Sequence, residues 1–134
     1  MKVEIFTLCD AATNSAGKLN ILGSFDTLWG KEKPITYPAC AIAMKIRFEK
    51  IEEGNHRIKL TFADVDGKLV MPSIDASAAV RFKPEDATTT AIFVLNLQRI
   101  KFDRFGEYTI DFAIDGRQEG SIPLYVRQHQ EPKV

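Results

Sequence analysis

The chain is poor in the residues that most often carry chemistry or covalent cross-links. Its 134 residues include two cysteines, two histidines and one tryptophan. Two cysteines are too few for the disulfide framework of a small secreted domain. A chain of this length buries enough surface to fold without cross-links or a structural metal. The sequence therefore predicts one globular domain held by its own core.

An excess of charge of one sign and long apolar runs are also missing. Eighteen basic residues balance eighteen acidic ones, so the formal net charge is zero. General affinity for nucleic acid or an anionic membrane needs clustered Lys and Arg. A spanning helix needs about 18 consecutive apolar residues, and Glu4 interrupts the apolar run that a signal peptide would carry. We expect a cytoplasmic protein with no nucleic acid or membrane partner.

What the sequence does have is apolar residues at every second position. Segments 42–48, 56–62, 108–114 and 122–126 alternate in this way. Successive side chains of a strand point to opposite faces, so each segment presents one apolar face to a core. The predicted core residues are Ile42, Met44, Ile46, Phe48, Ile58, Leu60, Phe62, Tyr108, Ile110, Phe112, Ile114, Ile122, Leu124 and Val126.

Four further runs and several turn signals complete the pattern. The runs are 3–8, 19–25, 76–82 and 91–97, and Asp66-Gly67 and Asp115-Gly116 are typical of tight hairpins. The predicted fold is all-β, a single antiparallel β-sandwich of about eight strands with an immunoglobulin-like or related Greek-key topology. It spans residues 1–126, and a polar, frayed C-terminal tail follows at 127–134.

Two segments are apolar on both faces. They are Ile92 to Leu95 and Ile5 to Leu8. One face of a sandwich sheet normally meets water, so these segments need a cover. A loop, a strand that crosses between the sheets or another subunit would supply it, and the last of these indicates self-association.

The longest predicted loop lies between Asp26 and Ala39. It contains Trp29, Tyr37, Leu28 and Ile35, which make it the candidate interaction surface. In the alternative interpretation, Trp29 and Tyr37 fold back and plug one end of the sandwich.

Catalytic signatures are not found. His56 begins a predicted strand and His129 lies in the tail, and neither belongs to a metal-binding or nucleophile motif. Cys40 shares the parity of the core residues, so we expect a buried thiol, and we expect Cys9 and Cys40 to stay reduced. An enzyme would require His56 to lie in a concave pocket beside Cys9 or an acid.

The strongest chemical pattern is the pair Asp64 and Asp66, closed by Gly67. Alternating aspartates resemble the start of a calcium loop, and Asp26 or Asp115 is a further ligand candidate from another loop. In the alternative interpretation, Asp66-Gly67 is only a tight turn. The metal-site hypothesis comprises Asp26, Asp64 and Asp66.

Other charged groups are interpreted as solvated. The pairs Glu52-Glu53 and Glu85-Asp86 lie on predicted turns, where they point outward instead of facing each other across a cleft. Four basic residues are expected on the outer face of two adjacent strands, without the aromatic platform that single-stranded nucleic acid needs: Lys45, Arg47, Arg57 and Lys59.

Two resemblances accompany these patterns. Asp103, Gly106 and Tyr108 resemble the tyrosine corner of immunoglobulin-like sandwiches, although Ile110 stands where the second cysteine of such domains would be. The segment 17–26, the Gly54 turn and Pro123-Leu124 resemble an uncharacterised family of small bacterial domains. The resemblance implies a bacterial cytosolic sandwich whose function is open.

From these features we predict a non-enzymatic interaction or assembly module without a cofactor. Its partner would be another protein or a second copy of the chain. The alternative is a sandwich domain that binds a small ligand or calcium through loop carboxylates.

Overall fold

The structure, a computed structural model, describes residues 1–129. Within this range it contains nine strands, and a single turn of 3-10 helix, η1, occupies Lys50–Glu52. The strands are β1 (Lys2–Ser15), β2 (Lys18–Ser24), β3 (Thr27–Gly30), β4 (Ile35–Glu49), β5 (Gly54–Asp64), β6 (Ile74–Val80), β7 (Thr88–Phe102), β8 (Gly106–Ile114) and β9 (Arg117–Gln128).

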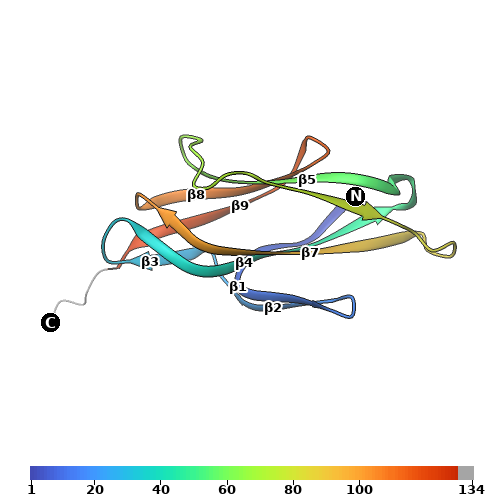
Figure 1. The fold of residues 1–134 in the computed structure, drawn as a ribbon, viewed down its shortest axis with the longest axis horizontal. Helices are drawn as coiled ribbons and strands as arrows, with labels where there is room; N and C mark the ends of the chain where they lie inside the picture. Colours follow the sequence, from blue (N-terminus) through green and yellow to red (C-terminus); the bar gives the residue numbers. More distant parts are fainter. Residues whose placement is uncertain (130–134) are drawn as a thin grey trace.

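These strands form two facing sheets. Sheet A has the order β2-β1-β4-β7 and sheet B the order β3-β9-β8-β5-β6. Figure 1 shows β5, β8 and β9 in one layer and β4 and β7 in the other. The β1–β2 hairpin lies below the second layer in this view. All neighbouring strands are antiparallel except β3, which pairs with β9 in parallel. The predicted all-β class is therefore confirmed, with nine strands in place of about eight.

The core lies between the two sheets, as the alternation predicts. From sheet A it receives the inner face of β4, and from sheet B the inner faces of β5, β8 and β9. Phe48, Phe102 and Phe112 are its largest fully buried side chains. Every predicted core residue is buried except Ile122, which is half-buried and packs against the same cluster.

A second, smaller cluster covers part of the outer face of sheet A. Cys9, Ala41 and Ala43 are fully buried there, and Ala12 and Leu19 of the β1–β2 hairpin pack against them. The hairpin therefore supplies part of the cover that the two-sided apolar segments were expected to need. Its tight turn is Ala16-Gly17, where both residues have positive φ.

Strand β9 extends two residues past Val126, the predicted end of the sandwich. β9 continues through Arg127 and Gln128, and the His129 backbone N–H donates to the Gly30 carbonyl at 2.7 Å. These residues belong to the sheet and not to a tail, because β3 pairs with this end of β9. The rest of the predicted tail, 130–134, lies outside the described residues. Over 1–129, the structure contains no helix long and apolar enough to cross a bilayer.

Candidate functional site

The single tryptophan, Trp29, lies on strand β3, and its side chain is exposed. Successive side chains of β3 alternate, so Leu28 enters the core and Trp29 points away from it. Trp29 is 59% exposed although its backbone is fixed by four paired positions on β9. A large aromatic side chain on an ordered strand is a contact surface that loses little conformational entropy on binding.

Two residues of β9 complete a patch around this tryptophan. Arg127 is directly opposite Trp29 in the strand register, and Tyr125 lies two residues before it on the same face. The Arg127 guanidinium carbon is 6.0 Å from the centre of the Trp29 ring and 5.0 Å from that of the Tyr125 ring. We call Trp29, Tyr125 and Arg127 the aromatic patch. These are the three residue types that carry most binding energy at protein interfaces.

The prediction of a long loop between Asp26 and Ala39 is wrong. It contains all of β3 and the start of β4, which leaves a short connection at 31–34. The pattern concealed this strand because it is four residues long and pairs in parallel, without a hairpin turn to mark it.

The four candidate interaction residues of this segment differ in how exposed they are. Leu28 and Ile35 are buried in the core and present no surface to a partner. Tyr37 is half-buried, with its ring 5.5 Å from Phe25, and its hydroxyl donates to Asp10 at 2.8 Å. Burial and this hydrogen bond raise the pKa of Tyr37 to about 12. Trp29 alone remains an exposed anchor, so these four residues do not form one surface.

The three aspartates of the metal hypothesis are not brought together. Asp64, at the end of β5, and Asp26, just before β3, are separated in sheet B by β8 and β9. No cluster of three or more His, Cys, Asp or Glu side chains suited to a metal ion occurs within residues 1–129.

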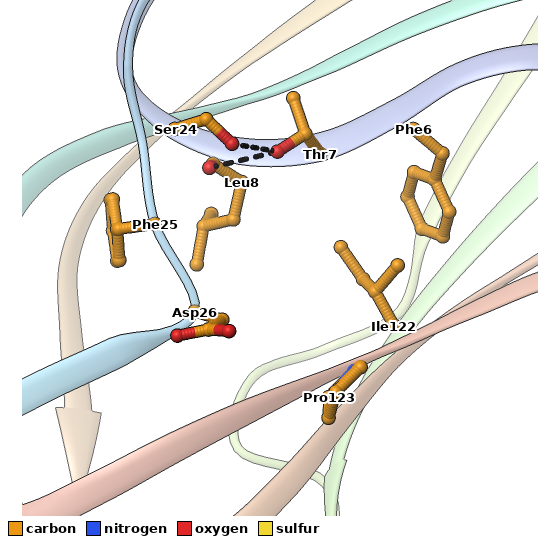
Figure 2. Close-up of a pocket in the computed structure, with 8 residues that line it drawn as sticks. All are labelled: Phe6, Thr7, Leu8, Ser24, Phe25, Asp26, Ile122 and Pro123. Atoms are coloured by element: carbon orange, nitrogen blue, oxygen red, sulfur yellow. Dashed lines mark hydrogen bonds between the residues drawn. The ribbon is translucent and has the colours of Figure 1, made fainter.

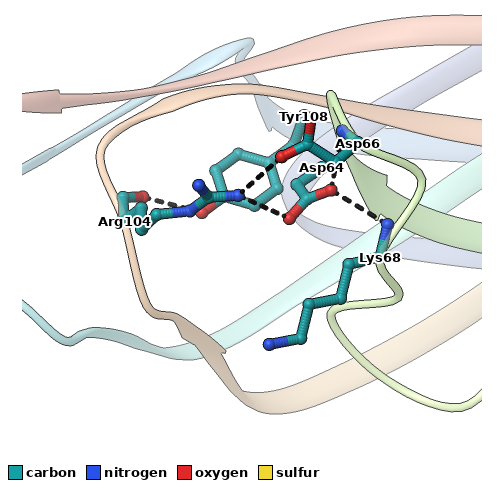
Figure 3. Close-up of polar contacts among 5 residues, drawn as sticks. All are labelled: Asp64, Asp66, Lys68, Arg104 and Tyr108. Atoms are coloured by element: carbon teal, nitrogen blue, oxygen red, sulfur yellow. Dashed lines mark hydrogen bonds and ion pairs between the residues drawn. The ribbon is translucent and has the colours of Figure 1, made fainter.

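The Asp64 carboxylate is instead committed to protein donors. One oxygen accepts the backbone N–H groups of Asp66 and Lys68, each at 2.9 Å, and the other accepts Arg104 at 2.9 Å (Figure 3). Asp66 contacts the same Arg104 nitrogen at 3.3 Å. The backbone N–H of Lys68, followed by Arg104, holds the pKa of Asp64 below its ordinary range. The cluster thus organises the Asp66-Gly67 turn, with Arg104 in the place that a cation would take.

The hydrogen bond expected of a tyrosine corner is present beside this cluster. Tyr108, at the start of β8, is buried, and its hydroxyl donates to the Arg104 carbonyl at 2.7 Å. Gly106 has φ +144°, a value that L side chains rarely adopt, and Asp103 is exposed and pairs with Lys101 at 3.9 Å. The bond fixes the connection between β7 and β8 to the core. An immunoglobulin-like topology as a whole stays a prediction.

His56 lies in a hollow at the opposite end of β5 from Asp64. Asp115, Glu52, Phe48 and Arg117 are among the residues that line this hollow with it. Nδ1 is 2.7 Å from an Asp115 carboxylate oxygen and Nε2 is 2.5 Å from the Glu52 carbonyl oxygen. Both neighbours accept hydrogen bonds, so they favour the doubly protonated ring, and the Glu52 carbonyl and Asp115 raise the pKa of His56.

This geometry does not suit a general base. His56 does lie in a hollow beside an acid, but both ring nitrogens are already engaged and its ring stacks on Phe48 at 5.2 Å. Its acid is placed by the β8–β9 turn, in which Asp115 and Gly116 both have positive φ. The second histidine, His129, follows the last residue of β9 and is exposed.

The two cysteines are free and lie on opposite faces of sheet A. Cys40 belongs to the core between the sheets, and Cys9 to the outer cluster with Ala41 and Ala43. Burial raises the pKa of Cys40 to about 11 and also raises that of Cys9. Both therefore remain thiols at neutral pH and are poor nucleophiles.

A further hollow opens between the sheets where β1 faces β9 (Figure 2). It has a volume of about 390 Å³. Phe6, Leu8 and Ile122 contribute apolar side chains, and the Thr7 and Ser24 hydroxyls are hydrogen-bonded to each other. Asp26 is the sole ionisable group among its eight lining residues. The hollow therefore brings together no acid–base pair.

The four basic residues expected on adjacent strands do not share a face. Lys45 and Arg47 belong to β4 in sheet A, whereas Arg57 and Lys59 belong to β5 in sheet B. The chain crosses between the sheets through η1, which the pattern does not distinguish from a hairpin. On sheet A, Glu4 pairs with Arg47 at 2.7 Å and with Lys45 at 3.6 Å, so the charge there is locally balanced.

The acidic pairs also differ from each other. Glu52 and Glu53 are both engaged: Glu52 accepts the Glu49 N–H at 2.9 Å and Glu53 accepts the Phe82 N–H at 2.8 Å. They stabilise the crossing between the sheets and do not face a cleft. Glu85 and Asp86 lie in the connection before β7.

Sequence reasoning missed Tyr125 and Arg127. The signal was present, because both have the outward parity opposite to the predicted core residues Leu124 and Val126. Trp29 could not be joined to them without knowing that β3 pairs with β9.

The comparison with protein families gives one match. The model of a family of unknown function, DUF6941, matches residues 4–127, so the chain belongs to this family. The predicted membership of an uncharacterised domain family is thereby confirmed. The search of curated proteins found no match.

Proposed function

For this member of a family of unknown function, we propose a non-enzymatic interaction module that binds a protein partner through the aromatic patch. The observation that carries the proposal is the exposure of Trp29 on a strand whose backbone is fully ordered by β9. An exposed tryptophan presents apolar area to water, and binding would remove that area from solvent.

The chemistry of the patch indicates the kind of partner. Arg127 lies against both aromatic rings, so a ligand would meet two apolar surfaces and one cation together. A protein segment with an apolar side chain beside a carboxylate complements this arrangement. The patch lies on the outer face of sheet B, so binding there does not require the core to open.

The polar groups singled out as candidates for chemistry are engaged in contacts within the domain. Both nitrogens of His56 are engaged and the thiols are buried. The Asp64 carboxylate accepts backbone N–H groups of its own turn, and the Asp115 carboxylate accepts the backbone N–H of Arg57 on β5. Each of these polar groups stabilises the local fold.

The test is Trp29→Ala compared with Leu22→Ala. Leu22 on β2 is 70% exposed, so its truncation removes a similar exposed apolar side chain at another edge. We expect both variants to keep the wild-type melting temperature. Wild type and Leu22→Ala immobilised as bait should retain the same native-host protein, and Trp29→Ala should lose it by about tenfold or more.

Two results would refute the proposal. A large loss of stability in Trp29→Ala would make the side chain part of the core. Equal retention of every bound protein by both variants would mean that the patch binds nothing.

A further inference from the structure

Strand β7 is a long edge strand without the usual protection. It has 15 residues and, among the described residues, pairs with β4 alone. From Thr88 to Gln98 it contains neither a charged residue nor a proline. The seven residues 89–95 are all half-buried, so apolar side chains remain partly in water on both faces of the strand. Such an edge is a template for pairing with another strand.

The other edges of the two sheets are short or interrupted. β2 and β6 have seven residues each and β3 has four, and Gly23 bends β2 with φ +68°. The part of β9 beyond β3 contains Pro123, which has no N–H to donate. Of these edges, β7 is the one that lacks features that prevent pairing with another strand. This difference indicates that the β7 edge has a partner.

The register shows which backbone groups of β7 face outward. The Leu8 carbonyl accepts the Phe25 N–H, so the polar groups of Leu8 point away from β4. Ile42 is opposite Leu8, and its own polar groups therefore point away from β1, towards Leu95 of β7. Groups alternate along a strand, so Phe93 is also directed at β4. The N–H and C=O groups that point away from β4 belong to Thr90, Ile92, Val94 and Asn96.

We propose that β7 pairs with β7 of a second copy of this chain, antiparallel and with Phe93 opposite Phe93. In this register Ile92 is opposite Val94 and Thr90 is opposite Asn96. Both pairs consist of residues whose polar groups point outward, so each pair can exchange two backbone hydrogen bonds. Apolar residues meet apolar ones and polar residues meet polar ones.

The charges at the two ends of β7 fit the same pairing. Glu85 and Asp86 precede the strand, and Arg99 and Lys101 lie at its other end. Antiparallel association places the acidic end of one copy beside the basic end of the other, at both ends of the contact. This complementarity and the polarity symmetry around Phe93 favour a second copy over an unrelated strand.

The association would join the two copies of sheet A into one continuous sheet. It is independent of the proposed function, because the aromatic patch lies on sheet B and stays exposed. A dimer would present two such patches, so binding to a multivalent partner would gain from avidity.

The test is sedimentation equilibrium of the full chain across the micromolar to millimolar range. We expect a monomer–dimer equilibrium for wild type. Ile92→Glu should weaken dimerisation by about tenfold or more. Within the monomer the new carboxylate would lie opposite Lys45, so the fold should be retained. Leu22→Glu, on the other edge of sheet A, is the matched control and should dimerise like wild type.

A second variant tests the backbone. Asn96→Pro removes an N–H that points away from β4, at an exposed position, and should also weaken the dimer. Amide exchange followed by NMR gives the register: the Ile92 and Val94 amides should become protected with rising concentration. The Phe93 and Leu95 amides should be protected at every concentration.

The proposal fails if wild type remains monomeric throughout the concentration range. It also fails if Leu22→Glu weakens dimerisation as much as Ile92→Glu. Concentration-dependent protection elsewhere, with none at Ile92 and Val94, would show a dimer built on another surface and would equally refute it.

Discussion

The two ends of β5 carry polar clusters of similar composition, but the cations of the two clusters differ in their exposure to solvent. At the start of the strand, His56 is 15% exposed and is fixed by Asp115 and the Glu52 carbonyl. At its end, the Asp64 side chain is 10% exposed, but its cationic partner Arg104 is 57% exposed. Both clusters contain an ion pair. Only the first has a cation that is largely shielded from solvent.

The difference shows that an ion pair's contribution depends on where its cation lies. An exposed guanidinium keeps most of its hydration and is screened by salt, so its pairing adds little to stability. A shielded imidazolium that donates to two acceptors loses more stabilisation when either acceptor is removed. At the Asp64 end, stability comes mainly from the backbone N–H groups that the carboxylate accepts.

The largest expected effect is that of His56→Ala. At about pH 6 the loss of two hydrogen bonds from a charged ring should lower the free energy of unfolding by about 2 kcal/mol. Urea denaturation of the variant and of wild type, followed by far-UV circular dichroism, measures the difference. A loss equal to that of an exposed-site control on the same strand, Lys59→Ala, would place His56 outside the stabilising cluster.

The difference in unfolding free energy between wild type and His56→Ala should also depend on pH, and the direction of the pKa shift gives its sign. The pKa of His56 is raised above its ordinary value, so the folded state binds the proton more tightly than the unfolded chain does. This contribution is fully present below the ordinary value of about 6.5 and is lost as the pH rises through the folded value. The difference between wild type and His56→Ala should therefore shrink in alkaline buffer. A difference that grows with pH would contradict the assignment.

Asp64→Ala should have an intermediate effect. It leaves the backbone N–H groups of Asp66 and Lys68 without their acceptor, so the melting temperature should fall, but by less than in His56→Ala. Asp66→Ala is the matched control, because that carboxylate contacts Arg104 and is well exposed. The pKa of Asp64 is lowered, so its contribution is present above its ordinary pKa and is lost as the pH falls through the lower, folded value. Equal losses in both variants would show that Arg104, and not the turn, carries the cluster.

Arg104→Ala should have the smallest effect on the melting temperature, and added salt should reduce that effect further. The backbone carbonyl that accepts the Tyr108 hydroxyl is unchanged in this variant. Melting curves at low and high ionic strength measure both quantities. A loss that exceeds that of Asp64→Ala would reverse the comparison between the two ends.

Alternation of apolar residues predicted most of the fold because burial on one face is a local, periodic requirement. It identified the inward residues of β4, β5, β8 and β9, and hence the all-β class and the core. Asp115-Gly116 was recognised as a hairpin turn because both residues tolerate positive φ. The tyrosine at the start of β8 was found in the same way, since its hydrogen bond reaches back only four residues.

The candidate site could not be read in the same way, because its contacts join distant parts of the chain. The four residues Thr27–Gly30 look like part of a loop until β9 provides a parallel neighbour. That pairing places Arg127 against Trp29. Likewise, the apolar run at Ile92 is visible in the sequence, but its place on an outer edge depends on the sheet order. Short-range periodicity determined which faces are buried. Long-range pairing, whose register is set by packing of the whole domain, decided which surfaces remain open.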